Sequence, residues 1–241
     1  MRLLVRSWNL YHGRTHPQSS TLRLEQMVRL VTADAPDVVA LQEVPMWAVR
    51  TLDDWSGMAA SWAQAMPSVA GPLARRLTEL DPERFRSSVS GQANALLVNP
   101  HLDAGRHRRI VLNPEVSRLD VLRGAQRRVC QALELEADSG RILLANLHAS
   151  NDPGAEQARK EVDRATAFLA GPDPCILCGD FNLERHPVGG FSEPIDGIDQ
   201  ILVRGLRIDR EPAAWPEERR RVDGAVLSDH APVEAVIAST S

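Results

Sequence analysis

The sequence predicts an α/β fold, and three observations support this prediction. Apolar runs of strand length recur along the whole chain. An amphipathic segment separates the first two runs, as in a strand–helix–strand unit. Polar residues suited to metal or phosphate chemistry directly follow several of the runs. The 241 residues, 43% of them apolar and 25% charged, are typical of a soluble globular protein, and we expect one domain over residues 1–241.

The first three elements form the strand–helix–strand unit. Leu3–Trp8 is predicted to be a buried strand. Residues 20–33 carry apolar side chains at helical spacing, and Val38–Leu41 is an unbroken apolar run of strand length. Residues 45–90 are rich in alanine and contain several tryptophans and prolines, which favours short helices joined by turns.

The rest of the chain is predicted to contain mostly strands and one long helix. We expect strands near residues 95–98, 109–112, 129–135, 142–147, 174–178, 200–203 and 233–238. Asp138–Gly140 is a turn sequence that would join two of these strands in a hairpin. Asp152-Pro153 is expected to begin a helix that continues to about Ala170.

The composition limits the partners and the location. The 28 basic and 32 acidic side chains give a net charge of −4, so the chain lacks the overall basic footprint of proteins that bind long duplex nucleic acid. No apolar run approaches the roughly 18 residues that a membrane span needs, and Met1–Arg6 lead directly into a strand. The 3 cysteines are too few for a disulfide framework. We expect a cytoplasmic monomer with no membrane span.

Polar residues gather where predicted strands end. Five such places carry Asn9; Gln42 and Glu43; Asn146 and His148; Asp180 and Asn182; and Asp229 and His230. Asn146 and His148 are two residues apart, as are Asp180 and Asn182, so each of these two pairs is expected to share one face of its strand. In α/β sheets ligands bind at strand ends. Each residue alone has an ordinary explanation as a turn or cap residue, but carboxylate, carboxamide and imidazole groups together predict metal-assisted hydrolysis of a phosphate ester.

Six segments resemble, in order, the motifs of the endonuclease/exonuclease/phosphatase superfamily, whose members have the deoxyribonuclease I-like fold. They are Ser7–Leu10, Leu41–Val44, Ala145–His148, Gly179–Asn182, Ile198–Ile201 and Ser228–Val233. The fourth and sixth motifs are the most specific, and the resemblance extends over residues 3–237. It implies a four-layer α/β sandwich, in which helices flank two packed mixed sheets.

The resemblance also implies a metal site. Glu43 is expected to be the main carboxylate ligand of a Mg²⁺ or Mn²⁺ ion, with Asn9 beside it. Asp229 would add a direct or water-mediated contact to the same ion.

Five further residues are expected to be catalytic by the same resemblance. His230 would contact the phosphate or act as general base, with Asp199 fixing its tautomer. Asp180 would orient or deprotonate the attacking water, and Asn182 would stabilise the phosphate oxygens. His148 would contact the phosphate or protonate the leaving group. A histidine here is typical of the deoxyribonuclease I-like and sphingomyelinase-like members, whereas abasic-site endonucleases have a tyrosine.

Other residues are candidates for substrate binding. Asn94 lies where the family often has a Gly-Asn pair, and Asn146 is predicted to share a strand face with the catalytic histidine. Arg127 and Arg128 flank a strand near the site and carry guanidinium groups that match phosphate oxygens. His12 follows the first motif closely enough to line the same pocket.

These observations together predict a Mg²⁺- or Mn²⁺-dependent phosphodiesterase. The candidate substrates are DNA or RNA, a phospholipid head group, an inositol phosphate and a small nucleotide. Alternatives are a nuclease, a phosphomonoesterase of the same fold, and a catalytically silent binding module. The complete set of candidate catalytic side chains argues against the last of these, because a binding module has no need of them all.

Overall fold

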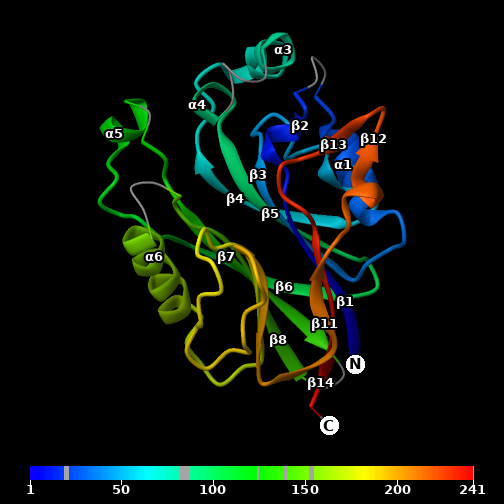
Figure 1. Cartoon of the computed structure of the whole chain (residues 1–241). Coiled ribbons are helices and arrows are strands. Elements are labelled where there is room, and N and C mark those ends of the chain that lie inside the picture. The colour runs from blue at the N-terminus through cyan, green and yellow to red at the C-terminus, as the bar shows by residue number, and fades with distance from the viewer. Residues whose placement is uncertain (19–21, 82–86, 124, 138–139, 152–154, 241) are drawn as a thin grey trace.

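The computed structural model describes the chain except for residues 19–21, 82–86, 124, 138–139, 152–154 and 241. Two large mixed sheets pack face to face, and helices cover their outer faces (Figure 1). This arrangement confirms the predicted four-layer α/β sandwich.

The larger sheet has six strands in the order β11-β14-β1-β3-β5-β4. Their bounds are Arg2–Asn9 (β1), Val38–Val44 (β3), Ala59–Met66 (β4), Gln92–Val98 (β5), Leu206–Ala214 (β11) and Val233–Ser239 (β14). β1 and β3 are parallel, whereas the other neighbours are antiparallel. The first and last parts of the chain therefore meet at the centre of this sheet.

The second sheet has five strands in the order β10-β9-β8-β7-β6. They are Asp103–Val111 (β6), Val129–Ala137 (β7), Gly140–His148 (β8), Cys175–Asp180 (β9) and Asp199–Arg204 (β10). β8 and β9 are parallel, and the remaining pairs are antiparallel, as predicted for the hairpin of β7 and β8. The residues Asp138 and Ser139 of the predicted turn lie outside the described residues.

The helices are few and mostly short. They are α1 (Leu24–Thr32), α2 (Leu52–Ser56), α3 (Ala74–Leu80), α4 (Ser87–Ser90), α5 (Arg118–Leu122) and α6 (Ala155–Phe168), with single turns η1 (Tyr11–Gly13), η2 (Gly71–Leu73) and η3 (Glu217–Arg220). A small sheet joins β2 (Thr15–His16), β12 (Arg221–Val222) and β13 (Ala225–Leu227). Asp152 and Pro153, the predicted start of α6, lie outside the described residues. No described helix is long and apolar enough to cross a membrane.

Three apolar cores separate the four layers. One lies between the two sheets and includes Val5 of β1 and Leu144 of β8. A second lies between the larger sheet and α1, where Met27 and Val28 of the helix pack on Trp8. The third lies between the second sheet and α6. The central strands therefore have an inward face toward the other sheet and an outward face toward a helical layer.

Strand alternation carries polar side chains to one end of the inward face. In β8, Ile142 and Leu144 face inward, and Asn146 and His148 continue the same face. The inward face thus becomes polar where β1, β3, β8 and β9 end, and it carries Asn9, Gln42, Asn146, His148 and Asp180 there. This end of the sandwich holds the candidate site.

Two strands of the larger sheet differ from the sequence-based expectation. β4 lies within residues 45–90, where we predicted only short helices, because its alanine-rich sequence has low strand propensity. Its pairing with β5 along almost its whole length overrides that propensity. β11 was not predicted either, because it is an edge strand with a mostly exposed sequence that includes Pro212.

Candidate active site

The ends of β1 and β9 meet at the polar end of the sandwich. Asn9 Nδ2 donates to Asp180 Oδ2 at 3.0 Å, which joins the two sheets. The side chain of Asp180 is almost completely buried, and its other oxygen accepts the backbone N–H of Asn182 at 3.0 Å. Hydrogen bonds from both sides therefore fix the orientation of this carboxylate.

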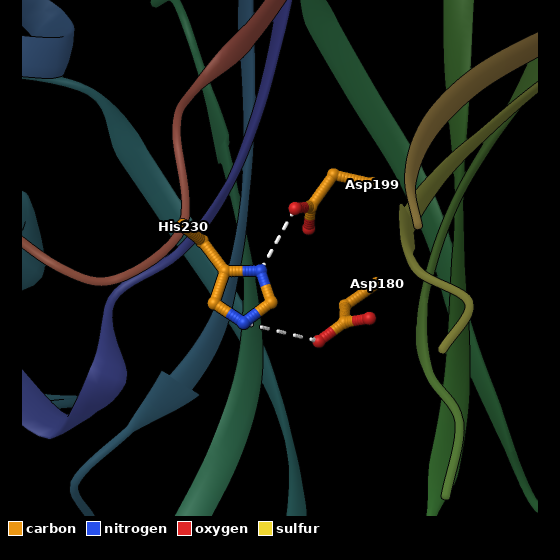
Figure 2. A group of neighbouring side chains, drawn as sticks. All are labelled: Asp180, Asp199 and His230. Carbon is orange, nitrogen blue, oxygen red and sulfur yellow. Dashed lines mark hydrogen bonds and ion pairs between the residues drawn. The ribbon is translucent and has the colours of Figure 1, made fainter. Parts of the chain in front are cut away.

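His230 lies between two carboxylates (Figure 2). Its Nδ1 is 2.8 Å from Asp199 Oδ2, and its Nε2 faces Asp180 Oδ2 at 3.9 Å. Asp199 is the first residue of β10 and pairs directly with Asp180 at the end of β9. A carboxylate on Nδ1 fixes the tautomer in which Nε2 points into the site.

Glu43 reaches the same site from the end of β3. One of its oxygens lies 3.4 Å from His12 Nε2, and the other lies 3.9 Å from His148 Nε2. His148 Nε2 is also 3.5 Å from Asp180 Oδ2. His148 therefore connects the carboxylates of the two sheets, and His12 lies beside Glu43.

Arg128 lies against the ring of His148. Its Nη1 is 3.1 Å from both ring nitrogens, and the residue is 3% exposed. Burial lowers the pKa of Arg128, although the negative charges of Glu43, Glu161 and Asp180 oppose this effect. Burial, and then the positive charge of Arg128, lower the pKa of His148 well below its usual value. His148 is therefore a neutral imidazole at neutral pH.

The two groups that face each other across the site have strongly shifted pKa values. Burial, and then repulsion by Asp199, raise the pKa of Asp180 to about 7. Burial alone would lower the pKa of His230, but its hydrogen bond to Asp199 and the surrounding carboxylates raise it to about 10. Perturbations of this kind cluster at functional sites.

Asn182 and Asp229 lie at the edge of this cluster. β9 ends at Asp180, and Asn182 follows it with a left-handed backbone (φ 49°), so the predicted shared strand face of these two residues is wrong. Asn182 is held at the site instead by its backbone bond to Asp180, while its Nδ2 donates to Ala149 O at 2.9 Å. Asp229 lies 4.0 Å from His230 Nε2 and has a side chain that is 45% exposed.

The structure places the candidate substrate-binding residues at different depths. Asn146 is completely buried between the sheets, and its carboxamide is used by Gln42 and by two backbone carbonyls, so it does not line the pocket. Asn94 is also buried and donates to Val129 O at 3.0 Å. Arg127 donates to Val116 O at 3.1 Å and lines a neighbouring cleft.

This cleft, of about 620 Å³, opens at the same end of the sandwich as the site. Apolar side chains such as Ile110 and Val129 line it together with Arg109 and Arg127. Val129 begins β7, whose next residue pairs with Leu147, the neighbour of His148. Among the described residues, neither arginine forms an ion pair with a carboxylate. The cleft therefore combines an apolar wall with free positive charge.

Two residues that sequence reasoning did not assign to the site hold its backbone. Trp8 Nε1 donates to His230 O at 2.9 Å. Ser228 is completely buried, and its hydroxyl donates to Asn9 O at 2.7 Å and accepts the His230 N–H at 3.1 Å. Both residues stand within recognised motifs, so their position was the available signal, but their hydrogen bonds depend on the tertiary structure.

The cluster offers oxygen and nitrogen atoms that could bind a metal ion. Asp180, Asp199 and His230 each offer a ligand atom, and these atoms lie within 4.8 Å of one another, close enough to hold one ion. The Glu43 carboxylate is partly exposed beside them. Burial, and then repulsion by Asp199, raise the pKa of Asp180, and a bound divalent cation would offset both effects. The donor set, mainly carboxylate oxygen, suits a hard divalent cation.

A comparison of the sequence with protein families agrees with this geometry. Residues 7–230 match the model of the Endonuclease/Exonuclease/phosphatase family. The chain belongs to this family. The matched range contains Asn9, Glu43, His148, Asp180 and His230, the residues that meet at the polar end of the sandwich. Comparison with curated proteins gives no significant match.

Several solved structures share the fold at low sequence identity. A functionally unknown conserved protein from Enterococcus faecalis has a TM-score of 0.74 and 18% identity, with 99% of this chain and 100% of that chain covered. The mannosyl-6-phosphatase of Bacteroides thetaiotaomicron has a TM-score of 0.65 and 16% identity, with 98% and 99% covered. The human Nocturnin catalytic domain with bound sulfate has a TM-score of 0.66 and 18% identity, with 99% and 94% covered. At these identities the likeness is one of fold.

Proposed function

We propose that the protein is a Mg²⁺- or Mn²⁺-dependent phosphodiesterase. The observation that carries this proposal is the meeting of His230, Asp180 and Glu43 from three different segments around one polar pocket. Hydrogen bonds hold two of these groups in place: the imidazole of His230 donates to Asp199, and Asn9 donates to the carboxylate of Asp180. Such preorganised groups are what hydrolysis of a phosphate ester requires.

We assign the metal to the Glu43 side of the pocket. Glu43 would be its main ligand, with Asn9 beside it and Asp229 adding a direct or water-mediated contact. When bound, a divalent cation would neutralise charge that develops on the phosphate oxygens. The opposite assignment, to Asp180, Asp199 and His230, would require His230 to give up its short bond to Asp199 or to bind only through Nε2.

His230 and Asp180 would have different roles in the attack of water on the phosphorus atom. Paired with Asp199, His230 carries a positive charge at neutral pH and presents its Nε2 proton to a phosphate oxygen. Asp180, held by Asn9 and by the backbone of Asn182, would orient the attacking water and accept its proton. This division matches the opposite charges of the two groups.

His148 and Asn182 would contact the remaining phosphate oxygens. His148 is buried against Arg128 and has a lowered pKa, which favours a hydrogen bond to the phosphate over protonation of the leaving group. Asn182 would donate through the N–H of its carboxamide that does not bind Ala149. Arg128, behind the ring of His148, would add positive charge close to the same oxygens.

We infer that the substrate is a small or single-ended phosphodiester. The cleft next to the site could take the group that flanks the scissile phosphate, with Arg109 and Arg127 beside any second anionic group. The net charge of −4 argues against tight binding along duplex DNA, whose affinity comes mainly from phosphate neutralisation. A nucleic-acid end, a phospholipid head group and a small soluble diester all meet this description.

Hydrolysis of bis-p-nitrophenyl phosphate tests the proposal. We expect turnover with Mg²⁺ or Mn²⁺ and none with EDTA. A parallel assay on p-nitrophenyl phosphate would identify a phosphomonoesterase. One of the proteins with a similar fold is named as a phosphatase. A metal-supplemented screen across plasmid DNA, RNA, sphingomyelin and inositol phosphates then defines the substrate. The absence of metal-dependent hydrolysis of every one of these would favour a binding module.

A further inference from the structure

The Glu43 carboxylate does not follow the alternation of its own strand. In β3, Val38 and Ala40 lie in the core between the sheets, whereas Val39 and Leu41 lie in the outer core beneath α1. Regular alternation would therefore turn Glu43 outward, with the odd-numbered residues. Its carboxylate instead approaches the histidines of the pocket.

A β-bulge causes this change of direction. The pairing of β3 with β5 passes from Leu41 opposite Ala95 to Val44 opposite Ala93, so β3 advances three residues while β5 advances two. Glu43, inside the bulge, has a left-handed backbone with φ 54°. This conformation is uncommon for a residue other than glycine and persists only where the surroundings hold it. Bulges beside active sites re-aim a side chain in this way.

Asn146 of the opposite sheet binds both strands at the point where the bulge begins. Its Nδ2 donates to Leu41 O at 2.9 Å and to Ala95 O at 2.8 Å, the two residues that form the last regular pair. Its Oδ1 accepts from Gln42 Nε2 at 2.8 Å, inside the bulge. The side chain is completely buried. Its carboxamide thus links β3, β5 and β8 around the residue that precedes Glu43.

We propose that Asn146 is a positioning residue that fixes the β3 bulge and so presents the Glu43 carboxylate to the divalent cation. The inference rests on the proposed function, because it concerns the ligand of that metal. Residues that orient a metal ligand typically change metal affinity by about 10–100-fold when replaced. Loss of the Asn146 carboxamide is therefore expected to weaken Mn²⁺ binding by about that factor. The KM for substrate at saturating metal should stay unchanged, because Asn146 is completely buried and cannot contact substrate.

The first test is calorimetric titration of Mn²⁺ into the full chain without substrate. Asn146→Leu keeps the size of the side chain and removes its hydrogen bonds, and Asn146→Ser is a milder variant in case the first does not fold. Leu144→Ala is the matched control, because Leu144 lies two residues earlier on the same face of β8, in the core between the sheets. We expect weaker Mn²⁺ binding in the Asn146 variants and wild-type affinity in the control at a similar loss of thermal stability.

Two further measurements separate positioning from general loosening of the core. Hydrogen exchange of the backbone amides of residues 42–44 should accelerate in the Asn146 variants and not in Leu144→Ala. In a double-mutant cycle, Asn146→Leu should add less than about twofold to the affinity lost in Glu43→Gln, because it acts through that carboxylate.

The outcomes distinguish this inference from the proposed function. If the wild-type chain binds Mn²⁺ and hydrolyses a phosphate ester, but the Asn146 variants keep wild-type Mn²⁺ affinity, the inference alone is wrong. Losses that multiply in the double mutant, or that equal those of Leu144→Ala, also overturn it. If the wild-type chain neither binds Mn²⁺ nor hydrolyses any phosphate ester, the proposed function fails and the inference fails with it.

Discussion

Strand β1 carries two buried polar clusters, and they differ in how well their charges are matched. At its middle, Arg6 is completely buried, yet its guanidinium meets Asp34 at 2.5 and 2.6 Å, Glu234 at 2.7 Å and Val31 O at 2.7 Å. At its end, Asn9 leads into a cluster in which His230 meets Asp199 at 2.8 Å, but Asp180 lies 3.5 Å from His148 and 3.9 Å from His230. Opposite charges are in contact in the first cluster, whereas in the second the Asp180 carboxylate is held apart from both imidazoles.

The pKa values of an aspartate and an arginine shift in opposite directions in the two clusters. Burial lowers the pKa of Arg6, but its hydrogen bonds to Asp34 and Glu234 outweigh this and raise it. The hydrogen bond from Arg6 lowers the pKa of Asp34. In the second cluster burial dominates, since the pKa of Asp180 rises to about 7 and that of Arg128 falls. The charged forms of Arg6 and Asp34 are thus favoured, whereas those of Asp180 and Arg128 are disfavoured; His230, paired with Asp199, is the exception in the second cluster, because its pKa is raised.

This difference indicates different roles for the middle and the end of β1. Matched charges contribute to the stability of the fold, because each buried ion has its partner. Charges held apart from their partners are poised for a ligand that supplies the missing charge. Variants of the first cluster should therefore affect folding, and variants of the second should affect activity and ligand binding.

The largest effect is expected in the catalytic cluster. His230→Ala and Asp180→Asn should each lower kcat by at least about 10²–10⁴-fold, the range for loss of general acid–base assistance. Thermal melting should stay close to wild type, and Asp180→Asn should be as stable as wild type or more stable at pH 8, because a buried charge is removed. Steady-state kinetics with a phosphodiester and melting curves measure both. A variant that retains more than a tenth of the wild-type rate would contradict the site assignment.

The next largest effect is expected at the matched cluster. Arg6→Met leaves the carboxylates of Asp34 and Glu234 without their partner, and breaking a buried ion pair from one side typically costs about 3–5 kcal/mol. Urea unfolding measures this free energy. Arg29→Met is the control, since Arg29 pairs with Glu25 on the exposed face of α1 and should change stability by less than about 0.5 kcal/mol. The folded fraction of Arg6→Met should keep wild-type kcat, and a loss of kcat beyond tenfold would remove the contrast between the clusters.

A smaller effect is expected for the proposed metal ligand. Glu43→Gln keeps the shape of the side chain and removes its charge, so it should weaken Mn²⁺ binding by about tenfold or more and reduce activity accordingly. High Mn²⁺ concentrations should restore part of the rate. Activity measured against metal concentration provides the test. Loss of activity with an unchanged metal titration would show that Glu43 is not the ligand.

The sequence predicted most strands because their signals are local. Apolar runs such as those of β1, β3 and β9 are buried on both faces and read clearly. β4 was missed because its alanines become a strand only through pairing with β5. The helices that form between residues 45 and 90 are short, as expected.

The sequence predicted which residues gather at the site, but it could not predict how deeply each of them is buried. Alternation places Asn146 and His148 on one face, which the structure bears out, yet only tertiary packing buries Asn146 against β3 and leaves His148 at the pocket. The direction of Glu43 was equally hidden, because it depends on a bulge whose register involves β5. The roles of these residues in catalysis remain predictions.

The smallest expected effect concerns pH and the edge of the matched cluster. The pKa of Asp34 is lowered in the folded chain, chiefly by its hydrogen bond from Arg6. A carboxyl group with a lowered pKa stabilises the fold above its unfolded value of 3.8, and this contribution disappears as the pH falls through the lower folded value. The side chain is 54% exposed, so solvent screening should keep the contribution below about 1 kcal/mol.

Asp34→Asn tests this contribution, because it removes the charge and keeps the shape. The free energy of unfolding in urea should be lower than wild type between pH 5 and pH 7, and the two proteins should converge as the pH falls below 3.8. Glu25→Gln, which removes an exposed carboxylate from the same helical layer, is the control and should show a smaller difference. A difference between wild type and Asp34→Asn that persists unchanged at the lowest pH would mean that Asp34 stabilises the chain by packing and hydrogen bonding, and that charge matching around Arg6 rests on Glu234 alone.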